Sequence, residues 1–320
     1  MRSVVCEELG SVVVVEGEPV EPGPGQVVVE VEAAGVNYVD GLFVQGRYQI
    51  KPRTPFVPGS EVAGTVVAVA SDVSAPAIGT RVLAMCGLGG FASRVAVPAA
   101  SAVPIPDRLD AVRAATFTQS YCTGLFALRE RGALRPDETV LVLGAGGGAG
   151  LAAVQVAKAL GARVLAAASS EEKREAALAA GAEAAVDTLA GDVKAAARAF
   201  SDGGVDLVYD PVGGPLADPA LRALRERGRY LVIGFASGAI PSLPLNQVLL
   251  RNRTVAGVDW GAWSMAHPLD QRGLLDELLA MVADGRLDPV APRTEPLESA
   301  GKVLDDLLDR RVTGKVALVP

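Results

Sequence analysis

The run "VLVLGAGGGAGLAAVQVAKALGA", which begins at Val140, constrains the fold of this chain more than any other stretch. It predicts a buried strand, a tight turn and a helix, with Gly144, Gly147 and Gly150 at the turn. Glycines there let the chain turn tightly and let a pyrophosphate approach the backbone. The helix N-terminus then offers N–H groups and a partial positive charge to the phosphates. An ordinary strand-to-helix turn is the alternative, and the G-x-x-G-x-x-G spacing does not by itself name a cofactor.

The sequence around this turn predicts a parallel sheet. From about residue 111 onward, apolar runs alternate with Ala/Leu/Arg segments, a pattern typical of parallel strands joined by crossover helices. Six strands with intervening crossovers fit a doubly wound Rossmann sheet. We expect these strands at 139–143, 163–168, 184–187, 205–210, 229–233 and 254–258.

The two ends of the chain have a different pattern. The first hundred residues alternate short valine-rich runs with Pro/Gly turns such as "EPGPGQ", which predicts a β-rich module with few helices. The tail after Asp259 predicts a helix and then a strand, too little for a domain of its own. The sequence therefore predicts an α/β protein in three segments: residues 1–115 and 259–320 form one β-rich domain, and residues 116–258 form the Rossmann domain.

The second Rossmann strand bears on the choice of cofactor. An NAD site places Asp or Glu at the end of this strand, on the ribose hydroxyls, but the strand here ends in "AAASSEEK". Ser169 and Ser170 can donate hydrogen bonds, and Lys173 can reach a 2′-phosphate as a point charge. The alternative is that Ser170 only caps a helix and Lys173 is solvated, although capping and phosphate binding are compatible. Glu171 and Glu172 disfavour a phosphate unless they point away. We therefore favour NADPH over NADH.

Composition excludes several classes of protein. The net charge is -7 and no run of five basic residues occurs, which argues against nucleic-acid binding. Three scattered cysteines without a C-x-x-C pair suggest a reduced, cytoplasmic protein. The one apolar stretch that approaches a membrane span, residues 140–156, holds five glycines and is too short, so we expect no membrane segment.

Motifs along nearly the whole chain resemble the medium-chain dehydrogenase/reductase superfamily, and within it the zinc-independent quinone oxidoreductases. The most specific are "GVNYVD", "PGSEVAG", the glycine turn, "YDPVGG" and the closing "TGKVAL". The resemblance implies a GroES-like catalytic domain built from both chain ends, a Rossmann domain between them and an active site in the cleft. It also implies a homodimer paired through Rossmann edge strands, here near residues 254–258.

The resemblance also implies that this chain lacks the catalytic zinc of related alcohol dehydrogenases. Those enzymes hold zinc with a cysteine, a histidine and a third Cys or Asp. The corresponding positions here are Asn37, Ser60 and a position near Gln119, none of which is a good zinc ligand. Cys6, Cys86, Cys122 and the lone His267 lack ligand spacing, so we expect no metal, and His267 before Pro268 suggests an exposed loop.

Without zinc, a hydrogen-bond donor has to stabilise the developing oxyanion. The candidates are Asn37, Tyr48 and Tyr121. Asp40 is expected to hold its loop through backbone N–H groups rather than act as a base. The cations of "RRVTGK" are expected on a solvated face, with no role in the site. The cofactor is expected to contact Asn37, Thr123, Gly144, Gly146, Gly147, Gly148, Ala149, Gly150, Ser169, Ser170, Lys173, Gly234, Phe235, Ser237, Asp259 and Trp260.

The sequence thus predicts an NADPH-dependent oxidoreductase that transfers hydride to a quinone or another conjugated carbonyl acceptor, a small molecule, without zinc. Two alternatives stay open. One is a reductase of enoyl thioesters (enoyl-CoA or enoyl-ACP) on the same scaffold, and the other is a non-catalytic NADPH-binding sensor. Fold does not fix the substrate, so the acceptor stays undecided.

Overall fold

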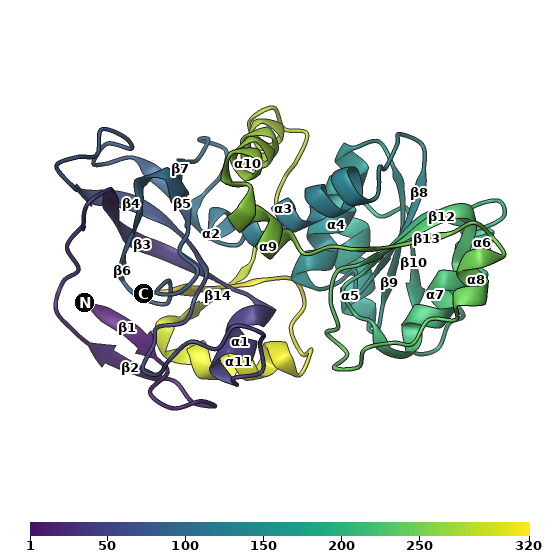
Figure 1. Cartoon of the computed structure of the whole chain (residues 1–320), viewed down its shortest axis with the longest axis horizontal. Coiled ribbons are helices and arrows are strands. Elements are labelled where there is room, and N and C mark those ends of the chain that lie inside the picture. Colours follow the sequence, from purple (N-terminus) through teal and green to yellow (C-terminus); the bar gives the residue numbers. More distant parts are fainter. The chain divides into compact units, whose positions relative to one another are not determined.

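The computed structural model describes residues 1–320 and divides them into two compact units. Unit 1 comprises Met1–Gln119 and Ala291–Pro320, and unit 2 comprises Ser120–Val290. Figure 1 labels most of the helices and strands of both units. No helix in the structure combines the length and the apolar run that a bilayer crossing needs.

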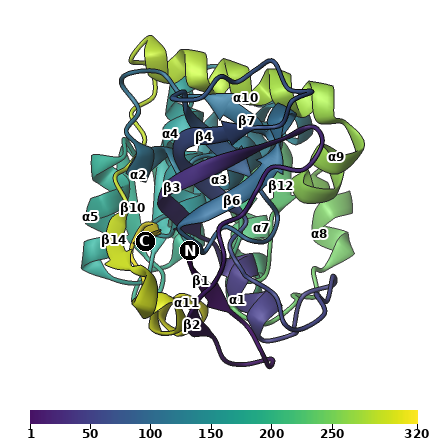
Figure 2. The same cartoon turned by 90° about the vertical axis from the view of Figure 1, so that its left-hand side faces the viewer.

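Unit 1 is built on a mostly antiparallel sheet. Its valine-rich strands bury their β-branched side chains in a core that includes Val29, Val62 and Val97. β3 lies between β4 and β6, as Figure 2 shows, and the chain returns at the end to add β15 and β14 beside β3. The strands are β1 (Arg2–Val5), β2 (Val13–Glu16), β3 (Gln26–Val36), β4 (Glu61–Val69), β5 (Arg81–Met85), β6 (Arg94–Pro98), β7 (Ala102–Pro104), β14 (Arg293–Pro296) and β15 (Val316–Val319).

Few helices accompany this sheet, as the sequence predicts. They are α1 (Tyr38–Val44), η1 (Ala99–Ser101), α2 (Ala111–Ala114), η4 (Leu297–Ser299) and α11 (Ala300–Leu308). β1 and β2 form a separate two-stranded sheet, and the larger sheet runs in the order β14-β15-β3-β4-β5-β7. The predicted β-rich character of this part of the chain is therefore confirmed.

Unit 2 is a doubly wound α/β unit. Its six parallel strands lie in the order β10-β9-β8-β11-β12-β13, so the chain starts in the middle of the sheet and winds outward in both directions. All six predicted strands are present, although β12 starts earlier than expected. The strands are β8 (Thr139–Leu143), β9 (Arg163–Ala168), β10 (Ala184–Asp187), β11 (Val205–Asp210), β12 (Leu224–Val232) and β13 (Thr254–Gly257).

The helices of unit 2 lie before, between and after its strands along the chain. They are α3 (Thr118–Leu125), η2 (Phe126–Arg131), α4 (Gly148–Ala159), α5 (Glu171–Ala179), α6 (Val193–Phe200), η3 (Gly214–Leu216), α7 (Ala217–Ala223), α8 (Leu245–Leu249), α9 (Trp260–Ala266) and α10 (Pro268–Ala283). α3 begins in unit 1 and continues into unit 2.

Residues 259–290 group with unit 2, whereas the sequence suggested that the whole tail joins the β-rich domain. Side-chain contacts explain the difference. Gln271 of α10 donates to Cys122 and accepts from the Trp260 indole, and Glu277 pairs with Arg129. Only the last part of the tail, residues 291–320, returns to unit 1.

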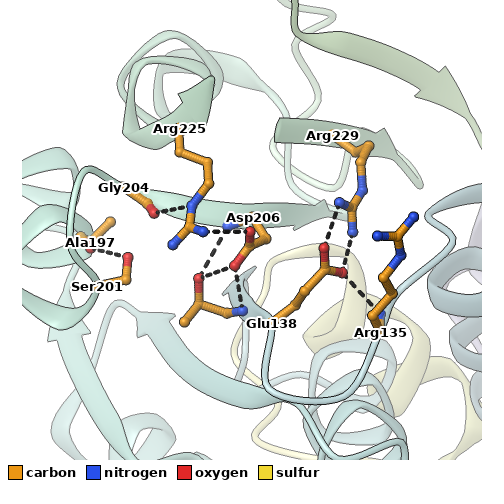
Figure 3. A network of polar contacts seen from close by, with 9 residues as sticks. Arg135, Glu138, Ala197, Ser201, Gly204, Asp206, Arg225 and Arg229 are labelled. Carbon is orange, nitrogen blue, oxygen red and sulfur yellow. Dashed lines mark hydrogen bonds and ion pairs between the residues drawn. The ribbon is translucent and has the colours of Figure 1, made fainter. Parts of the chain in front are cut away.

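Charged residues at the amino ends of the unit 2 strands pair with one another (Figure 3). Both carboxylate oxygens of Glu138 accept hydrogen bonds from the Arg229 guanidinium. Asp206 forms an ion pair with Arg225 and accepts a hydrogen bond from the Thr139 backbone N–H. These pairs satisfy the half-buried charges at that edge of the sheet. Polar groups that could bind a ligand are therefore expected at the carboxyl ends of the unit 2 strands.

Candidate cofactor and acceptor sites

The turn after β8 in unit 2 has the backbone geometry of a phosphate cradle. β8 is buried along its length, and α4 starts at Gly148 after an N-cap, Gly147, that has no side chain to satisfy the first N–H groups. A Cβ at Gly150 would lie 2.2 Å from the Gly144 carbonyl oxygen, so only glycine fits there. Gly144 has a φ of +59°, which also favours glycine. The turn thus presents unshielded N–H groups at a helix N-terminus.

Lys173 packs directly on this turn. A Cβ built on Gly146 would lie 2.3 Å from the Lys173 Cβ, so the backbone of the turn and the lysine stem are in contact. Ser170 caps α5 by accepting a hydrogen bond from the Lys173 N–H at 3.3 Å, as its capping role predicts. β9 ends at the buried Ala168, and the exposed Ser169 and Ser170 follow it, with no acid at the strand end. The structure therefore brings a cation and two hydroxyls beside the glycine turn.

Two further loops lie with the glycine turn. A Cβ at Gly144 would lie 2.8 Å from Val212 Cγ2, in the loop that follows β11. The Ser237 backbone N–H donates to the Val212 carbonyl at 2.9 Å, and the Gly234 N–H donates to the Asp210 carbonyl. The predicted segment 234–237, which includes the half-exposed Phe235, is thereby held at the same carboxyl edge as the cradle.

Other predicted residues of unit 2 have structural partners. Asp259 caps α9 by accepting from the Ala262 N–H at 3.0 Å, and the buried Trp260 donates its indole N–H to Gln271. Thr123 is half-buried on α3. These contacts assign capping and packing roles to Asp259 and Trp260, and a cofactor contact for either residue stays a prediction.

The Tyr121 hydroxyl is poorly placed to donate a hydrogen bond to a bound substrate, because its proton already has a partner in the protein. This hydroxyl, 5% exposed, donates to Gln155 Oε1 at 2.5 Å and accepts from the Val290 N–H at 3.2 Å. A tyrosine hydroxyl has one proton, and Gln155 takes it. The oxyanion role that the sequence suggests for Tyr121 would require breaking this bond.

A second polar cluster lies in unit 1, where strand register brings distant residues together. Val36 of β3 pairs with Val316 of β15, and Gly35 of β3 pairs with Glu61 of β4. The residues next to these pairs, Asn37, Ser60 and Lys315, therefore meet at one end of three neighbouring strands. The Ser60 hydroxyl donates to Gln119 Oε1 at 3.1 Å. Asn37, Ser60 and Gln119, which the resemblance sets at or near the zinc-ligand positions of related enzymes, thus lie together.

Glu61 and Lys315 occupy the centre of this cluster, and the sequence analysis missed both. The Lys315 ammonium donates to Asn37 Oδ1 and lies 3.2 Å from Glu61 Oε1. Glu61, 1% exposed, also accepts from Asn37 Nδ2 at 2.9 Å and from the Gln119 backbone N–H at 3.0 Å. The expectation that "RRVTGK" lies wholly on a solvated face is wrong for Lys315. The β15–β3 pairing, which no local pattern reveals, buries its side chain.

The remaining predicted residues of unit 1 have distinct surroundings. Asp40 accepts from the Asn37 backbone N–H at 2.8 Å, which is the loop-holding role expected for it. Burial raises the pKa of Asp40 to about 7, although the Asn37 N–H and the Lys315 charge favour its ionised form. Tyr48 is half-buried, with its ring edge against Phe43 at a centroid distance of 5.0 Å.

The cluster does not fit zinc. It offers two amides and a hydroxyl at the ligand positions, and nowhere in the structure do three or more His, Cys, Asp or Glu side chains gather as a metal site would require. The Lys315 ammonium bonds to Asn37 and Glu61, the oxygens that a cation would need. His267 is exposed at the junction of α9 and α10.

Comparison with known proteins gives consistent results for both units. Residues 23–107 match the alcohol dehydrogenase GroES-like domain, and residues 148–278 match the family described as zinc-binding dehydrogenase. Over 321 residues, the chain is 37% identical to quinone oxidoreductase-like protein 2 of Bos taurus, covering 99% of this chain and 92% of that protein.

Two solved structures are similar along their whole length. The quinone oxidoreductase of Thermus thermophilus, also solved in complex with NADPH, is 36% identical with a TM-score of 0.83, and each chain is covered fully. The quinone oxidoreductase of Escherichia coli, solved in complex with NADPH, is 27% identical with a TM-score of 0.89 and the same full coverage.

Proposed function

This chain belongs to the quinone oxidoreductase family of the medium-chain dehydrogenases/reductases, and from that premise we propose that it uses NADPH to reduce a quinone or another conjugated carbonyl without zinc. The observation that carries the proposal is the cradle of unit 2, where Lys173 contacts the glycine turn and β9 ends in Ala168 and two serines rather than in an acid. Two relatives with the same fold were solved with NADPH.

Several groups at the carboxyl edge of the unit 2 sheet suit the parts of NADPH. The N–H groups at the start of α4 suit the pyrophosphate, and Ser169, Ser170 and Lys173 suit a 2′-phosphate. The loops 211–214 and 234–237 flank the same edge, where the nicotinamide and its ribose would lie. When bound, NADPH supplies a hydride to the acceptor and leaves as NADP⁺.

The poor fit of Asn37, Ser60 and Gln119 to zinc supports the proposed acceptor class. Reducing a quinone or a conjugated enone places charge on an oxygen that shares it with the conjugated system, so a hydrogen-bond donor suffices where an isolated alkoxide would need a metal. Tyr48 and Asn37 remain proposed acceptor-site residues, although the Asn37 amide already contacts Glu61, Ser60 and Lys315. A proton from water completes the product.

The proposal is tested by following oxidation of NADPH and of NADH after dialysis against a chelator, with 1,4-benzoquinone or a crotonyl thioester as acceptor. We expect chelator-resistant turnover of the quinone with NADPH preferred. Preference for the thioester would instead assign the chain to the enoyl reductases. NADPH binding without turnover of either acceptor would favour the sensor.

The Lys173→Ala variant tests the cofactor choice. We expect it to weaken NADPH binding by about 1–3 kcal/mol, because a charge-assisted contact to the 2′-phosphate is lost, and to leave NADH binding nearly unchanged. Calorimetric titration of both cofactors measures this. The control is Lys158→Ala, since Lys158 lies in the last turn of α4, at the far end of that helix from the cradle. Equal losses for NADPH and NADH would rule out the 2′-phosphate contact.

We also propose that the protein forms the homodimer expected from the family. β13 is the edge strand of the unit 2 sheet, its Val255 is 39% exposed, and Leu245 and Leu249 of the preceding helix α8 are each more than 70% exposed. An edge with apolar neighbours favours pairing with a second copy. We expect Val255→Glu to shift the protein from dimer to monomer in sedimentation velocity, because it places a carboxylate from each copy in the proposed apolar interface. A dimer unchanged by Val255→Glu would place the interface elsewhere.

The three cysteines are free thiols in the structure, which supports a protein that works in the reducing cytoplasm.

A further inference from the structure

The hydrogen bonds of the unit 1 cluster form a chain that starts at Lys315, and in this chain each group donates to the next. Lys315 can only donate, so the Asn37 oxygen has to face it, and an ionised Glu61 can only accept, so the Asn37 NH₂ faces the carboxylate. These two charged groups fix the orientation of the Asn37 amide without ambiguity. The charged pair is buried, with 13% of the Lys315 side chain and 1% of the Glu61 side chain exposed.

The chain of donors continues from Asn37 to Ser60 and then to Gln119. Asn37 Nδ2 donates to Ser60 Oγ at 3.4 Å, and the Ser60 hydroxyl donates to Gln119 Oε1 at 3.1 Å. Glu61 Oε2 holds the backbone N–H of Gln119 at 3.0 Å, so this residue is fixed at both its main chain and its side-chain oxygen. The chain of donors therefore ends at Gln119 Nε2, which makes no hydrogen bond in the structure and belongs to a half-buried residue.

We propose that Gln119 is a catalytic residue: its side-chain NH₂ donates a hydrogen bond to the carbonyl oxygen of the acceptor as that oxygen becomes negative. This inference rests on the proposed function. As the acceptor gains a hydride, its carbonyl oxygen takes the displaced electron pair, and a proton from water then neutralises it. Donors in a chain polarise one another, so the Lys315 charge strengthens the Gln119 donor. Lys315, Asn37 and Ser60 are its positioning residues.

We favour Gln119 as the donor to the acceptor because the N–H and O–H groups of the other candidates already donate to protein groups. The Asn37 NH₂ is divided between Glu61 and Ser60, the Ser60 proton goes to Gln119, and the Tyr121 proton goes to Gln155.

The test is binding of 4-nitrophenolate, an analogue of the anionic product, to the complex with NADP⁺. 4-Nitroanisole, which has the same ring without the oxyanion, is the matched ligand. We expect Gln119→Leu to lose about tenfold to a hundredfold in phenolate affinity and to keep its anisole affinity within about twofold. NADPH binding and the unfolding midpoint serve as controls for the fold. We expect kcat with 1,4-benzoquinone to fall in parallel.

Ser60→Ala tests the positioning chain, because it removes the link to Gln119 and leaves the donor itself. We expect a smaller loss of phenolate affinity, about threefold to tenfold, again without an effect on the anisole. Equal phenolate affinity in Gln119→Leu and the wild type would overturn the assignment. Absence of quinone turnover in the wild type would overturn the proposed function alone, since phenolate binding is measured without turnover.

Discussion

Lys315→Met is expected to destabilise unit 1 by about 3–5 kcal/mol, because it leaves the carboxylate of Glu61 buried and without its cation. The two remaining hydrogen bonds to Glu61, from Asn37 Nδ2 and the Gln119 N–H, do not replace the lost charge. For a unit of this size the loss corresponds to a fall of roughly 10 °C in its unfolding midpoint. Differential scanning calorimetry measures the change.

A second substitution separates the charge from the packing. Lys315→Met combined with Glu61→Gln removes both charges, so we expect the double variant to be more stable than Lys315→Met alone. Recovery is expected to be partial, because the new amide places a donor against either Asn37 Nδ2 or the Gln119 N–H. Lys302→Met is the matched control, since Lys302 is 77% exposed in its pair with Asp306 and its loss is expected to cost under about 1 kcal/mol. If Lys315→Met and Lys302→Met had the same unfolding midpoint, the buried Lys315–Glu61 pair would contribute no more to the stability of unit 1 than the exposed Lys302–Asp306 pair.

The sequence was sufficient where local patterns determine structure. The six strands of unit 2 are apolar runs with regular spacing, and the glycine turn after β8 is specified by backbone chemistry. The cap at Ser170 and the loop-holding role of Asp40 follow from residue type and position. Such features depend on neighbours within a few residues along the chain.

The unit 1 cluster could not be derived in the same way. Lys315 reaches Asn37 across 278 positions of the sequence, through the pairing of β15 with β3. A lysine among the cations of "RRVTGK" has the sequence pattern of a solvated residue, and only strand register shows that it is buried. The hydrogen bond of the Tyr121 hydroxyl could not be derived for a related reason. Its partner Gln155 lies on α4, and nothing near residue 121 indicates that its proton is taken.

Asp40→Asn is expected to change how the stability of unit 1 depends on pH. Burial raises the pKa of Asp40 from 3.8 to about 7, so the folded protein keeps a proton that the unfolded chain releases above about pH 4. The unfolded state therefore binds fewer protons between pH 4 and 7, and stability falls as the pH rises through this window. At about 1.4 kcal/mol per pKa unit, the loss is of the order of 4 kcal/mol, and it is complete above pH 7.

The asparagine variant removes this titration while it keeps the loop in place. Its side-chain oxygen can still accept from the Asn37 N–H, and its NH₂ takes the place of Asp40 Oδ1, an oxygen without a hydrogen-bond partner. We expect Asp40→Asn to exceed the wild type in stability at pH 8 and to approach it at pH 4, as measured by urea unfolding across this range. Asp107→Asn, at an exposed position, is expected to show no such trend. A difference between Asp40→Asn and the wild type that stayed constant from pH 4 to 8 would show that Asp40 is already ionised when buried, held so by Lys315 and the Asn37 N–H.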